Sequence, residues 1–301
     1  MDIAITNVHL DLGAGRRGTD MGPSAIHVAQ LIPSLKNLGH TIPSITSIGS
    51  KSSEALEIGQ ENARFLDHIL SICNRIQTEV INNIANGHFP LVLGGDHSQA
   101  IGTISGLGKC FRNQGKSLGV IWVDAHTDMN TPQTTPSGNI HGMPLSTLLG
   151  YGHPQLTALN GSHPALKPEH VAIIGARDVD TKEIPLVKEL GVLVYTMNDL
   201  DRRGAATCFA EAIERIGERT DGIHLSFDLD GVDPKEAPGV GTPVPGGLSL
   251  RESHLLCEML CETQKLIGME VVELNPTLDI ANQTGRLAVW LIQSALGKTI
   301  L

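Results

Sequence analysis

The sequence has few aromatic residues, no long apolar run and no surplus of positive charge. Phe, Trp and Tyr make up only 3% of its 301 residues, so a buried core must be built mainly from Leu, Ile and Val. No stretch reaches the roughly 18 consecutive apolar residues that a membrane-spanning helix needs. The net charge of −10 argues against nucleic acid or an anionic membrane as the main partner. It suits a cationic small molecule.

The chain also lacks a disulfide framework and a recognisable secretion signal. Its five cysteines have no framework spacing. We interpret them as buried free thiols rather than metal ligands or a redox pair, including Cys257 and Cys261, which are four residues apart. The N-terminal segment has neither a basic region nor a long apolar stretch. We therefore expect a soluble, reduced, cytoplasmic protein.

Short apolar runs rich in β-branched residues alternate with helical patterns along the whole chain. Strands are expected near Ile3–Val8, Thr41–Ile48, Pro90–Leu93, Leu118–Val123, His170–Ile174, Val192–Thr196, Gly222–Phe227 and Gly268–Val272. Helices are expected near Pro23–Leu38, Glu57–Ala85, Ser98–Phe111, Thr181–Glu189, Ala205–Ile216, Leu250–Glu262 and Ala281–Leu296. Pro23 suits the first turn of its helix, and Asp279 is a candidate cap for the last one. The alternation predicts an α/β fold with one mainly parallel sheet covered on both faces. Because no repeat or linker interrupts it, we expect residues 1–301 to form a single domain.

The glycine-rich segment Gly13–Gly18 has the spacing of a dinucleotide-binding loop, but we do not interpret it as one. Thr19–Pro23 intervenes before the next helix, so no helix N-terminus meets the glycines to hold a pyrophosphate. We expect the glycines to allow a tight turn instead.

Two of the predicted strands end in closely spaced carboxylates. Asp124 and Asp128 flank His126 after one strand, and Asp228 and Asp230 follow the other. Side chains two residues apart point to the same side of an extended chain, and open α/β sheets place their ligands at the carboxyl ends of the strands. Such a concentration of negative charge is unfavourable without a cation. The pattern predicts a divalent metal site, with two ions.

A third strand ends in Gly94-Gly95-Asp96-His97. The glycines let the backbone approach a crowded site closely, and His97 adds an imidazole nitrogen. Imidazole and carboxylate ligands without thiolate favour a harder ion than structural zinc, and manganese is a natural candidate. Two such ions lower the pKa of a water molecule between them to near neutrality.

These three segments resemble the metal motifs of the ureohydrolase superfamily, which contains arginases, agmatinases and related amidinohydrolases. The similarity continues through Gly13–Gly22, Arg177–Asp180 and Glu270–Glu273, so it covers nearly the whole chain. The resemblance implies a three-layer αβα sandwich around an eight-stranded, mainly parallel sheet. It also implies two Mn²⁺ ions, one held by His97, Asp124, Asp128 and Asp228 and the other by Asp124, His126, Asp228 and Asp230.

The resemblance also implies catalytic roles. A hydroxide that bridges the metals would attack the guanidinium carbon, with Asp128 accepting its hydrogen bond. Glu273 corresponds to the glutamate that holds the substrate guanidinium, and Thr242 resembles a threonine near that group. His141 would protonate the leaving amine or move protons to bulk water, because a histidine pKa lies near neutrality.

The polar segment between Asn130 and His141 separates arginase from its relatives. A partly desolvated α-carboxylate must be hydrogen-bonded, whereas agmatine has no such group. The side chains that resemble arginase contacts to the α-carboxylate are Asn130, Thr135, Ser137 and Asn139, and those that resemble contacts to the α-ammonium are Asp180 and Glu183. An ordinary turn would also be rich in such residues.

The sequence is most similar to a bacterial-type arginase, which converts L-arginine and water to L-ornithine and urea. Many bacterial arginases are oligomers, so we expect a homo-oligomer, either a hexamer or a trimer. One alternative is an agmatinase or another amidinohydrolase that acts on a different guanidine. The other is a binding homologue without activity, which the complete ligand set disfavours.

Overall fold

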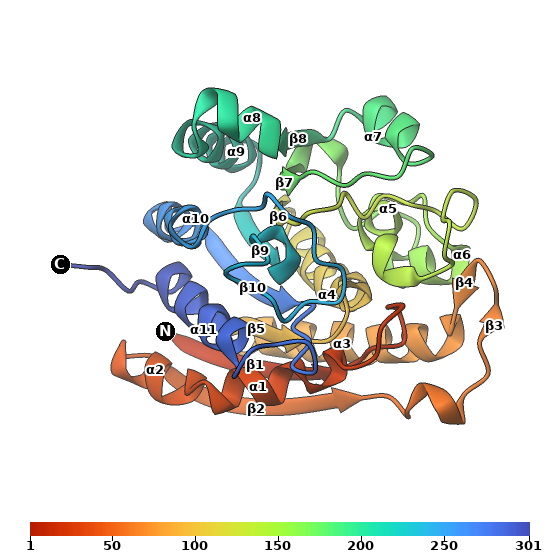
Figure 1. The fold of residues 1–301 in the computed structure, drawn as a ribbon, viewed down its shortest axis with the longest axis horizontal. Coiled ribbons are helices and arrows are strands. Elements are labelled where there is room, and N and C mark those ends of the chain that lie inside the picture. The colour runs from red at the N-terminus through yellow and green to blue at the C-terminus, as the bar shows by residue number, and fades with distance from the viewer.

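The computed structural model describes residues 1–301 and contains one eight-stranded, fully parallel sheet (Figure 1). The strands lie in the order β2-β1-β5-β10-β9-β6-β7-β8. Their bounds are β1 Asp2–His9, β2 Thr41–Gly49, β5 Phe89–Gly94, β6 Leu118–Val123, β7 Val171–Ala176, β8 Leu193–Thr196, β9 Gly222–Asp228 and β10 Leu266–Val272. All eight predicted strands are confirmed, each to within two residues at either end.

Helices cover both faces of the sheet and make a three-layer α/β/α structure (Figure 1). One face carries α1 Gly22–Val28, α2 Leu31–Asn37, α8 Met197–Arg203, α9 Ala205–Arg219, α10 Leu250–Glu262 and α11 Gln283–Ala295. The other carries α3 Leu66–Ala85, α4 Ala100–Asn113, α5 Pro144–Leu148, α6 Pro154–Thr157 and α7 Ile184–Leu190.

Strand β6 illustrates why the sheet needs cover on both sides. Ile121 and Val123 pack in the core under α9 and α10, whereas Val120 and Trp122 pack in the core under α3 and α4. This alternation follows from the two-residue period of a strand. None of the helices combines the length and the apolar character that crossing a membrane requires.

Two predicted helices have different boundaries in the structure. The pattern over Pro23–Leu38 is not one helix, because Gln30 has a left-handed backbone (φ 68°) and separates α1 from α2. The pattern over Glu57–Ala85 becomes helical only at Leu66. The residues before it form a short hairpin of β3 Gly59–Gln60 and β4 Ala63–Arg64.

Helix ends account for the remaining differences. Asp279 is not adjacent to α11, which begins at Gln283. Its carboxylate nevertheless caps the first turn of that helix, because it accepts hydrogen bonds from the N–H groups of Thr284 and Gly285. The unpredicted helix α8 begins with a reciprocal capping box between Thr196 and Asp199. Pro23 lies in the first turn of α1, as expected. All five cysteines are free, although Cys110 and Cys261 are only partly buried.

The order of the central strands positions the three predicted metal segments. Strands β5, β10, β9 and β6 are neighbours, and all point the same way. Their carboxyl ends therefore meet at one edge of the sheet, although the segments that follow them are widely separated in the sequence.

Candidate active site

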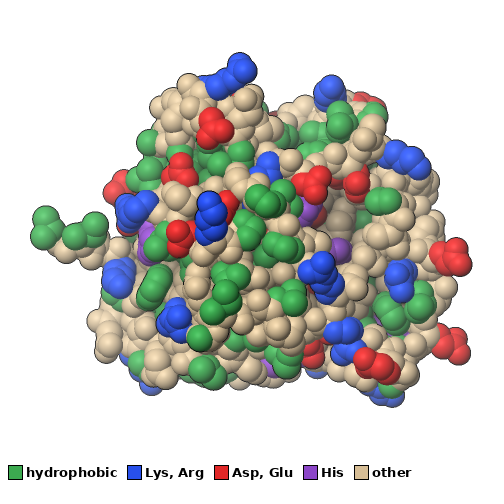
Figure 2. Space-filling view, in the orientation of Figure 1, with side chains coloured by type: hydrophobic (Ala, Val, Ile, Leu, Met, Phe, Trp, Pro, Cys, Tyr) green, Lys and Arg blue, Asp and Glu red, His purple; other side chains and the backbone are tan.

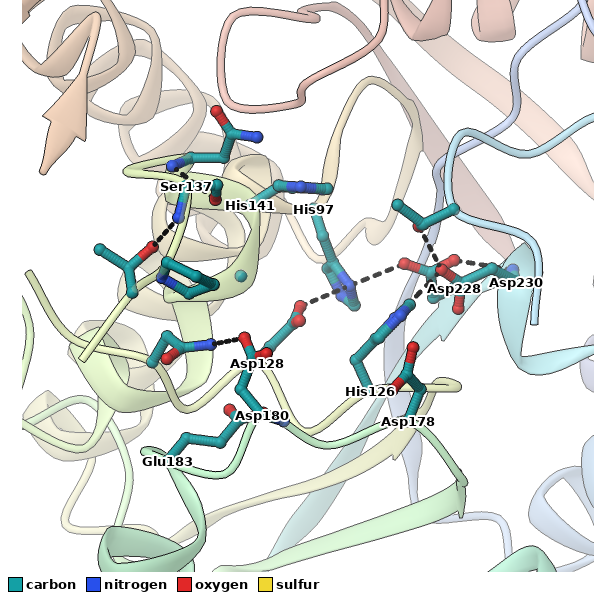
Figure 3. Close-up of a pocket in the computed structure, with 16 residues that line it drawn as sticks. His97, His126, Asp128, Ser137, His141, Asp178, Asp180, Glu183, Asp228 and Asp230 are labelled. Atoms are coloured by element: carbon teal, nitrogen blue, oxygen red, sulfur yellow. Dashed lines mark hydrogen bonds and ion pairs between the residues drawn. The ribbon is translucent and has the colours of Figure 1, made fainter. Parts of the chain in front are cut away.

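Four neighbouring strands deliver the predicted metal and catalytic side chains to one place (Figure 3). His97 follows β5 after the turn at Gly94 and Gly95. The segment from Asp124 to Asp128 follows β6, and Asp228 ends β9. Gly94 has φ 77°, and a Cβ there would lie 2.4 Å from the ring of Pro23, so this turn requires glycine.

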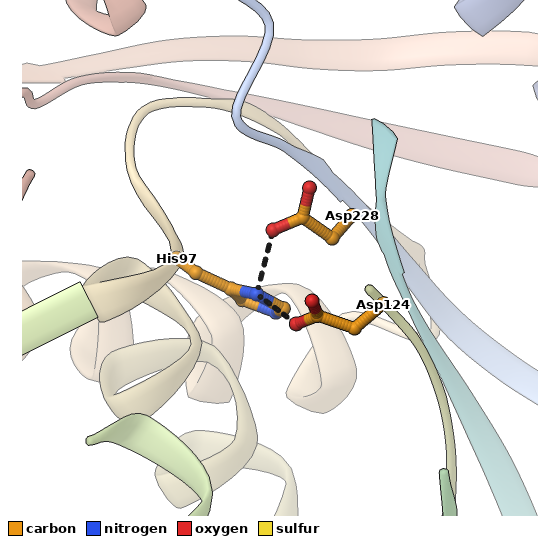
Figure 4. Close-up of side chains that lie close together, drawn as sticks. All are labelled: His97, Asp124 and Asp228. Carbon is orange, nitrogen blue, oxygen red and sulfur yellow. Dashed lines mark ion pairs between the residues drawn. The ribbon is translucent and has the colours of Figure 1, made fainter. Parts of the chain in front are cut away.

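The first cluster surrounds the Nδ1 atom of His97 with three carboxylates (Figure 4). This nitrogen lies 3.2 Å from Asp124, 3.1 Å from Asp128 and 3.0 Å from Asp228. Ligand atoms of His97, Asp124 and Asp228 all lie within 4.8 Å of one another. One imidazole nitrogen cannot satisfy three buried carboxylates, whereas a divalent cation between them would do so.

The second cluster is built around His126. Its Nδ1 atom lies 3.2 Å from Asp124 Oδ1 and 3.2 Å from Asp230 Oδ2. Asp124 thus offers one oxygen to each cluster, as expected of a ligand shared by two ions. The two triads are consistent with a binuclear metal site. The sharing of Asp228 between both ions stays a prediction, because its Oδ1 atom accepts a hydrogen bond from the N–H of Asp230.

The charge states of these groups favour bound cations. Burial, with repulsion from Asp230 and Asp124, raises the pKa of Asp228 well above its ordinary value. Burial and the charge of Asp124 raise the pKa of Asp128 to about 7. Burial lowers the pKa of His97, but its three carboxylate contacts outweigh burial and raise it well above normal. Ligands must give up their protons to bind a metal ion, so a cation among these groups would lower their pKa values again and bind more tightly as the pH rises.

Three residues that the sequence analysis did not single out support the first cluster. The indole N–H of Trp122 donates to Asp124 Oδ2 at 3.0 Å, and its ring stacks on His97 with centroids 4.1 Å apart. On the other side, His97 Nε2 lies 2.9 Å from the hydroxyl of Ser226, which donates to Glu270. Such outer partners fix the orientation of a metal-binding histidine. Trp122 and Ser226 each lie two residues before a ligand, so strand alternation could have identified them.

Arg177 organises the loop that carries Asp230. Its guanidinium donates six hydrogen bonds to five backbone carbonyls, including that of Asp230 at 2.7 Å and that of Val244 at 2.7 and 3.1 Å. Asp233 secures the same loop by accepting hydrogen bonds from the N–H groups of Gly246 and Gly247. The hydroxyl of Thr242, at the inner side of this loop, donates to Asp230 at 2.8 Å.

His141 and Glu273 form a buried pair beside the metal clusters. His141 Nδ1 lies 2.9 Å from Glu273 Oε1, which also accepts the backbone N–H of His97 at 2.9 Å. Burial lowers the pKa of His141, but the charge of Glu273 outweighs it and raises the pKa to about 9. Glu273 is 1% exposed, and its second oxygen, Oε2, has no hydrogen-bond partner.

A polar cleft of about 210 Å³ leads to the clusters, and Figure 2 shows a hollow at this face with histidine and acidic side chains around it. All predicted site residues line this cleft except Asp124, which lies beneath it, and Glu273, which lines a neighbouring cavity. The hydroxyl of Thr135 accepts the N–H groups of Ser137 and Gly138, and the hydroxyl of Ser137 accepts that of Asn139. Both hydroxyl groups keep their own hydrogens for a ligand.

The far wall of the cleft is acidic. Asp180 is exposed and accepts a hydrogen bond from the amide of Asn130 at 2.8 Å. Glu183 is 3% exposed, and its oxygens accept the N–H groups of Met129 and Asp180. Asp178, to which the sequence analysis assigned no role, also lines this wall.

Comparisons with known proteins agree with this arrangement. The family model described as the arginase family matches residues 1–297. The arginase of Bacillus caldovelox is 48% identical over 300 residues, which cover 99% of each chain, and its crystal structure superposes with a TM-score of 0.95. The crystal structure of arginase from Bacillus subtilis is 47% identical, with complete coverage of both chains and a TM-score of 0.93. This chain therefore belongs to the arginase family of hydrolases.

Proposed function

We propose that this protein hydrolyses L-arginine to L-ornithine and urea at two Mn²⁺ ions. Family membership supports the reaction, and the twin clusters of carboxylate and imidazole, with no thiolate, support manganese. When bound, two such cations would lower the pKa of a water molecule and so supply a nucleophile near neutral pH. The expected ligands are His97, Asp124, Asp128 and Asp228 for one ion and Asp124, His126, Asp228 and Asp230 for the other.

The side chains around the clusters would then position the substrate and move protons. Asp128 accepts a hydrogen bond from the attacking water and so orients a lone pair of the water oxygen toward the guanidinium carbon. Glu273 receives the guanidinium N–H groups on its unpartnered Oε2 atom. His141, held protonated by Glu273, donates a proton to the ornithine amine as the C–N bond breaks. Thr242 holds Asp230 and borders the guanidinium.

The amino-acid end of the substrate would lie in the outer cleft. The hydroxyls of Thr135 and Ser137 and the amides of Asn130 and Asn139 donate to the α-carboxylate. Asp180 attracts the α-ammonium directly, whereas Glu183, whose oxygens already accept two backbone N–H groups, acts through water. This group of hydroxyl and amide donors beside the metal clusters is the observation that favours arginine, which has an α-carboxylate, over agmatine, which has none.

Turnover of arginine and of agmatine by the Mn²⁺-loaded protein tests this proposal. A site built to hydrogen-bond a group rejects analogues without it by factors of roughly 10⁴, and partial exposure of the cleft should reduce this to at least about a hundredfold in kcat/KM. Replacing Asn130 and Ser137 together with Ala should raise KM for arginine far more than it lowers kcat. Agmatine supplies the matched control, because its kcat/KM should not change. Equal turnover of the two substrates by the unmodified protein would instead favour a different amidinohydrolase.

We also propose a cytoplasmic homo-oligomer, a hexamer or a trimer. Several large apolar side chains are exposed on the isolated chain, including Val28 at 70%, Ile280 at 65% and Trp290 at 43%. Apolar side chains of this size are commonly covered at subunit contacts. Light scattering after size-exclusion chromatography measures the subunit number directly, and a monomer at micromolar concentration would contradict this proposal.

A further inference from the structure

A second cavity of about 240 Å³ lies next to the substrate cleft. Asn139, His141 and Thr242 line both cavities, so these side chains form the wall between them. The second cavity is also lined by Ala14, Gly15, Arg16, Gly241 and Glu273, none of which borders the cleft. It therefore reaches His141 and Glu273 from beside the cleft, with Asn139 as the one predicted amino-acid contact on the shared wall.

The glycine-rich loop Gly13–Gly18 forms the outer rim of this cavity, above His141 in Figure 3. The loop is held at both ends. Gly13 donates its N–H to Asp96 and accepts that of His141, and the carbonyl of Arg17 accepts the amide of Asn275. A Cβ at the tip residue Gly15 would lie 2.9 Å from the amide nitrogen of Asn139, so glycine keeps the rim open there.

The inner end of the cavity presents a hydrogen-bond acceptor. Glu273 Oε2 is buried without a partner, and the opposite wall at Gly241 carries no side chain that could fill the space. A buried acceptor left without a donor is unfavourable, so this atom is available to an N–H group of a ligand. Urea retains two –NH2 groups of the guanidinium, and it can stay hydrogen-bonded to Glu273 after the C–N bond breaks.

The rim discriminates by charge. Arg16 is exposed at the mouth and forms no ion pair. Its positive charge repels the cations arginine and ornithine but not neutral urea. The cavity volume is about eight times the roughly 30 Å³ that one water molecule occupies in the liquid, which is enough for urea with some water.

We propose that this cavity is a separate exit for urea, while arginine enters and ornithine leaves through the polar cleft. The proposal rests on the proposed arginase function. Urea forms at the inner end of the cleft, where ornithine blocks the way out as long as its amino-acid end is held. An opening beyond His141 and Glu273 lets the small neutral product leave without waiting for ornithine.

Two substitutions at the rim narrow the cavity without touching the cleft. Ala14→Leu adds bulk at the rim, and Ala14→Ser is its matched control. Arg16→Trp adds bulk at the exposed mouth, away from Glu273 Oε2, and Arg16→Gln is its matched control. The second variant keeps the test decisive if Ala14→Leu does not fold.

Slow release of urea has a kinetic signature that a damaged site lacks. Steps after an irreversible bond cleavage do not enter kcat/KM, so kcat and KM should fall together, by on the order of tenfold, with kcat/KM unchanged. Rapid-quench measurements should then show a burst of ornithine close to one per active site, followed by the slow steady state. Ala14→Ser should behave as the unmodified enzyme.

Two results would overturn the exit. If kcat is unchanged in both narrowed variants, urea leaves by another route. If kcat/KM falls with kcat and no burst occurs, the cavity belongs to substrate binding or to the chemical step. Failure of the arginase function is recognised beforehand, because the unmodified protein would release no urea from arginine.

Discussion

Replacing Arg177 with lysine should weaken one metal cluster and spare the other. The guanidinium holds five carbonyls of three segments with six hydrogen bonds, and one of those carbonyls belongs to the ligand Asp230. Lysine keeps the positive charge but has three donors on one nitrogen, so it cannot reach this spread of acceptors. Asp230 would lose its backbone anchor, whereas His97 follows another strand and Asp228, although only two residues earlier, is held in β9 by its pairing with β10.

The expected loss of Mn²⁺ affinity follows from the hydrogen bond between Arg177 and the carbonyl of Asp230. Its length is 2.7 Å, and a hydrogen bond from a charged donor contributes about 1.5–3 kcal/mol. A tenfold change in affinity corresponds to about 1.4 kcal/mol, so Mn²⁺ affinity at the Asp124–His126–Asp230 cluster should fall by roughly ten- to a hundredfold. This range agrees with the effect of outer partners at other metal sites. Affinity at the His97–Asp124–Asp228 cluster should change by less than about threefold.

Calorimetric titration of metal-stripped protein with Mn²⁺ resolves the two affinities. The matched control is Arg251→Lys, because the guanidinium of Arg251 pairs with Glu258 at the surface of α10 and contacts no part of the site. Two ions bound by Arg177→Lys with unchanged affinities would refute the reasoning. Equal weakening of both sites, with a lower melting temperature, would show that Arg177 supports general stability only.

Three further substitutions test the metal centre and the catalytic pair. Asp228→Ala should abolish activity and release at least one Mn²⁺ per subunit, as measured by elemental analysis; full occupancy with a normal rate would exclude Asp228 as a ligand. Glu273→Gln keeps shape but removes charge, and should lower kcat/KM by more than about tenfold, since hydrogen bonds to charged groups contribute roughly 1.5–3 kcal/mol; an unchanged rate would mean that Glu273 does not hold the guanidinium. His141→Asn should destabilise the metal-free protein in a pH-dependent way. The pKa of His141 rises on folding from 6.5 to about 9, so the ion pair stabilises fully below pH 6.5 and loses its effect as the pH rises through 9. The difference in melting temperature between the two proteins should therefore shrink at alkaline pH, and a constant difference would contradict the pairing with Glu273.

The strands could be predicted because their signal is local. Central strands such as β6 and β7 are buried along their whole length and are nearly continuous apolar runs, whereas β2 at the edge of the sheet alternates apolar and polar residues. Helix boundaries were less predictable. Nothing in the identity of Gln30 signals its left-handed backbone, which divides α1 from α2. Asp279 caps α11 across an intervening turn, so inspection of neighbouring residues placed the start of the helix too early.

Candidate metal ligands could be identified from sequence because each motif combines residue type and spacing at a strand end. The supporting groups were not, because their roles depend on contacts between distant segments. Arg177 acts on carbonyls some 53–67 residues away, and Glu270 reaches His97 only through Ser226 on the neighbouring strand. Asp128 and Glu273 both have positive φ, 51° and 63°, a strained conformation that neither residue type predicts.

The sequence by itself determined the α/β class, the eight strands, the family and a set of candidate ligands, because the signal for each of these lies in short segments. Only the tertiary structure decided how the segments meet. The neighbouring positions of β5, β10, β9 and β6 bring His97 within 3.2 Å of three carboxylates from two other strands. The same packing sets the glycine-rich loop Gly13–Gly18 over His141, where it rims a second cavity. Strand order and loop docking depend on which apolar surfaces are buried against each other, and the residue pattern of a single segment does not specify its partner.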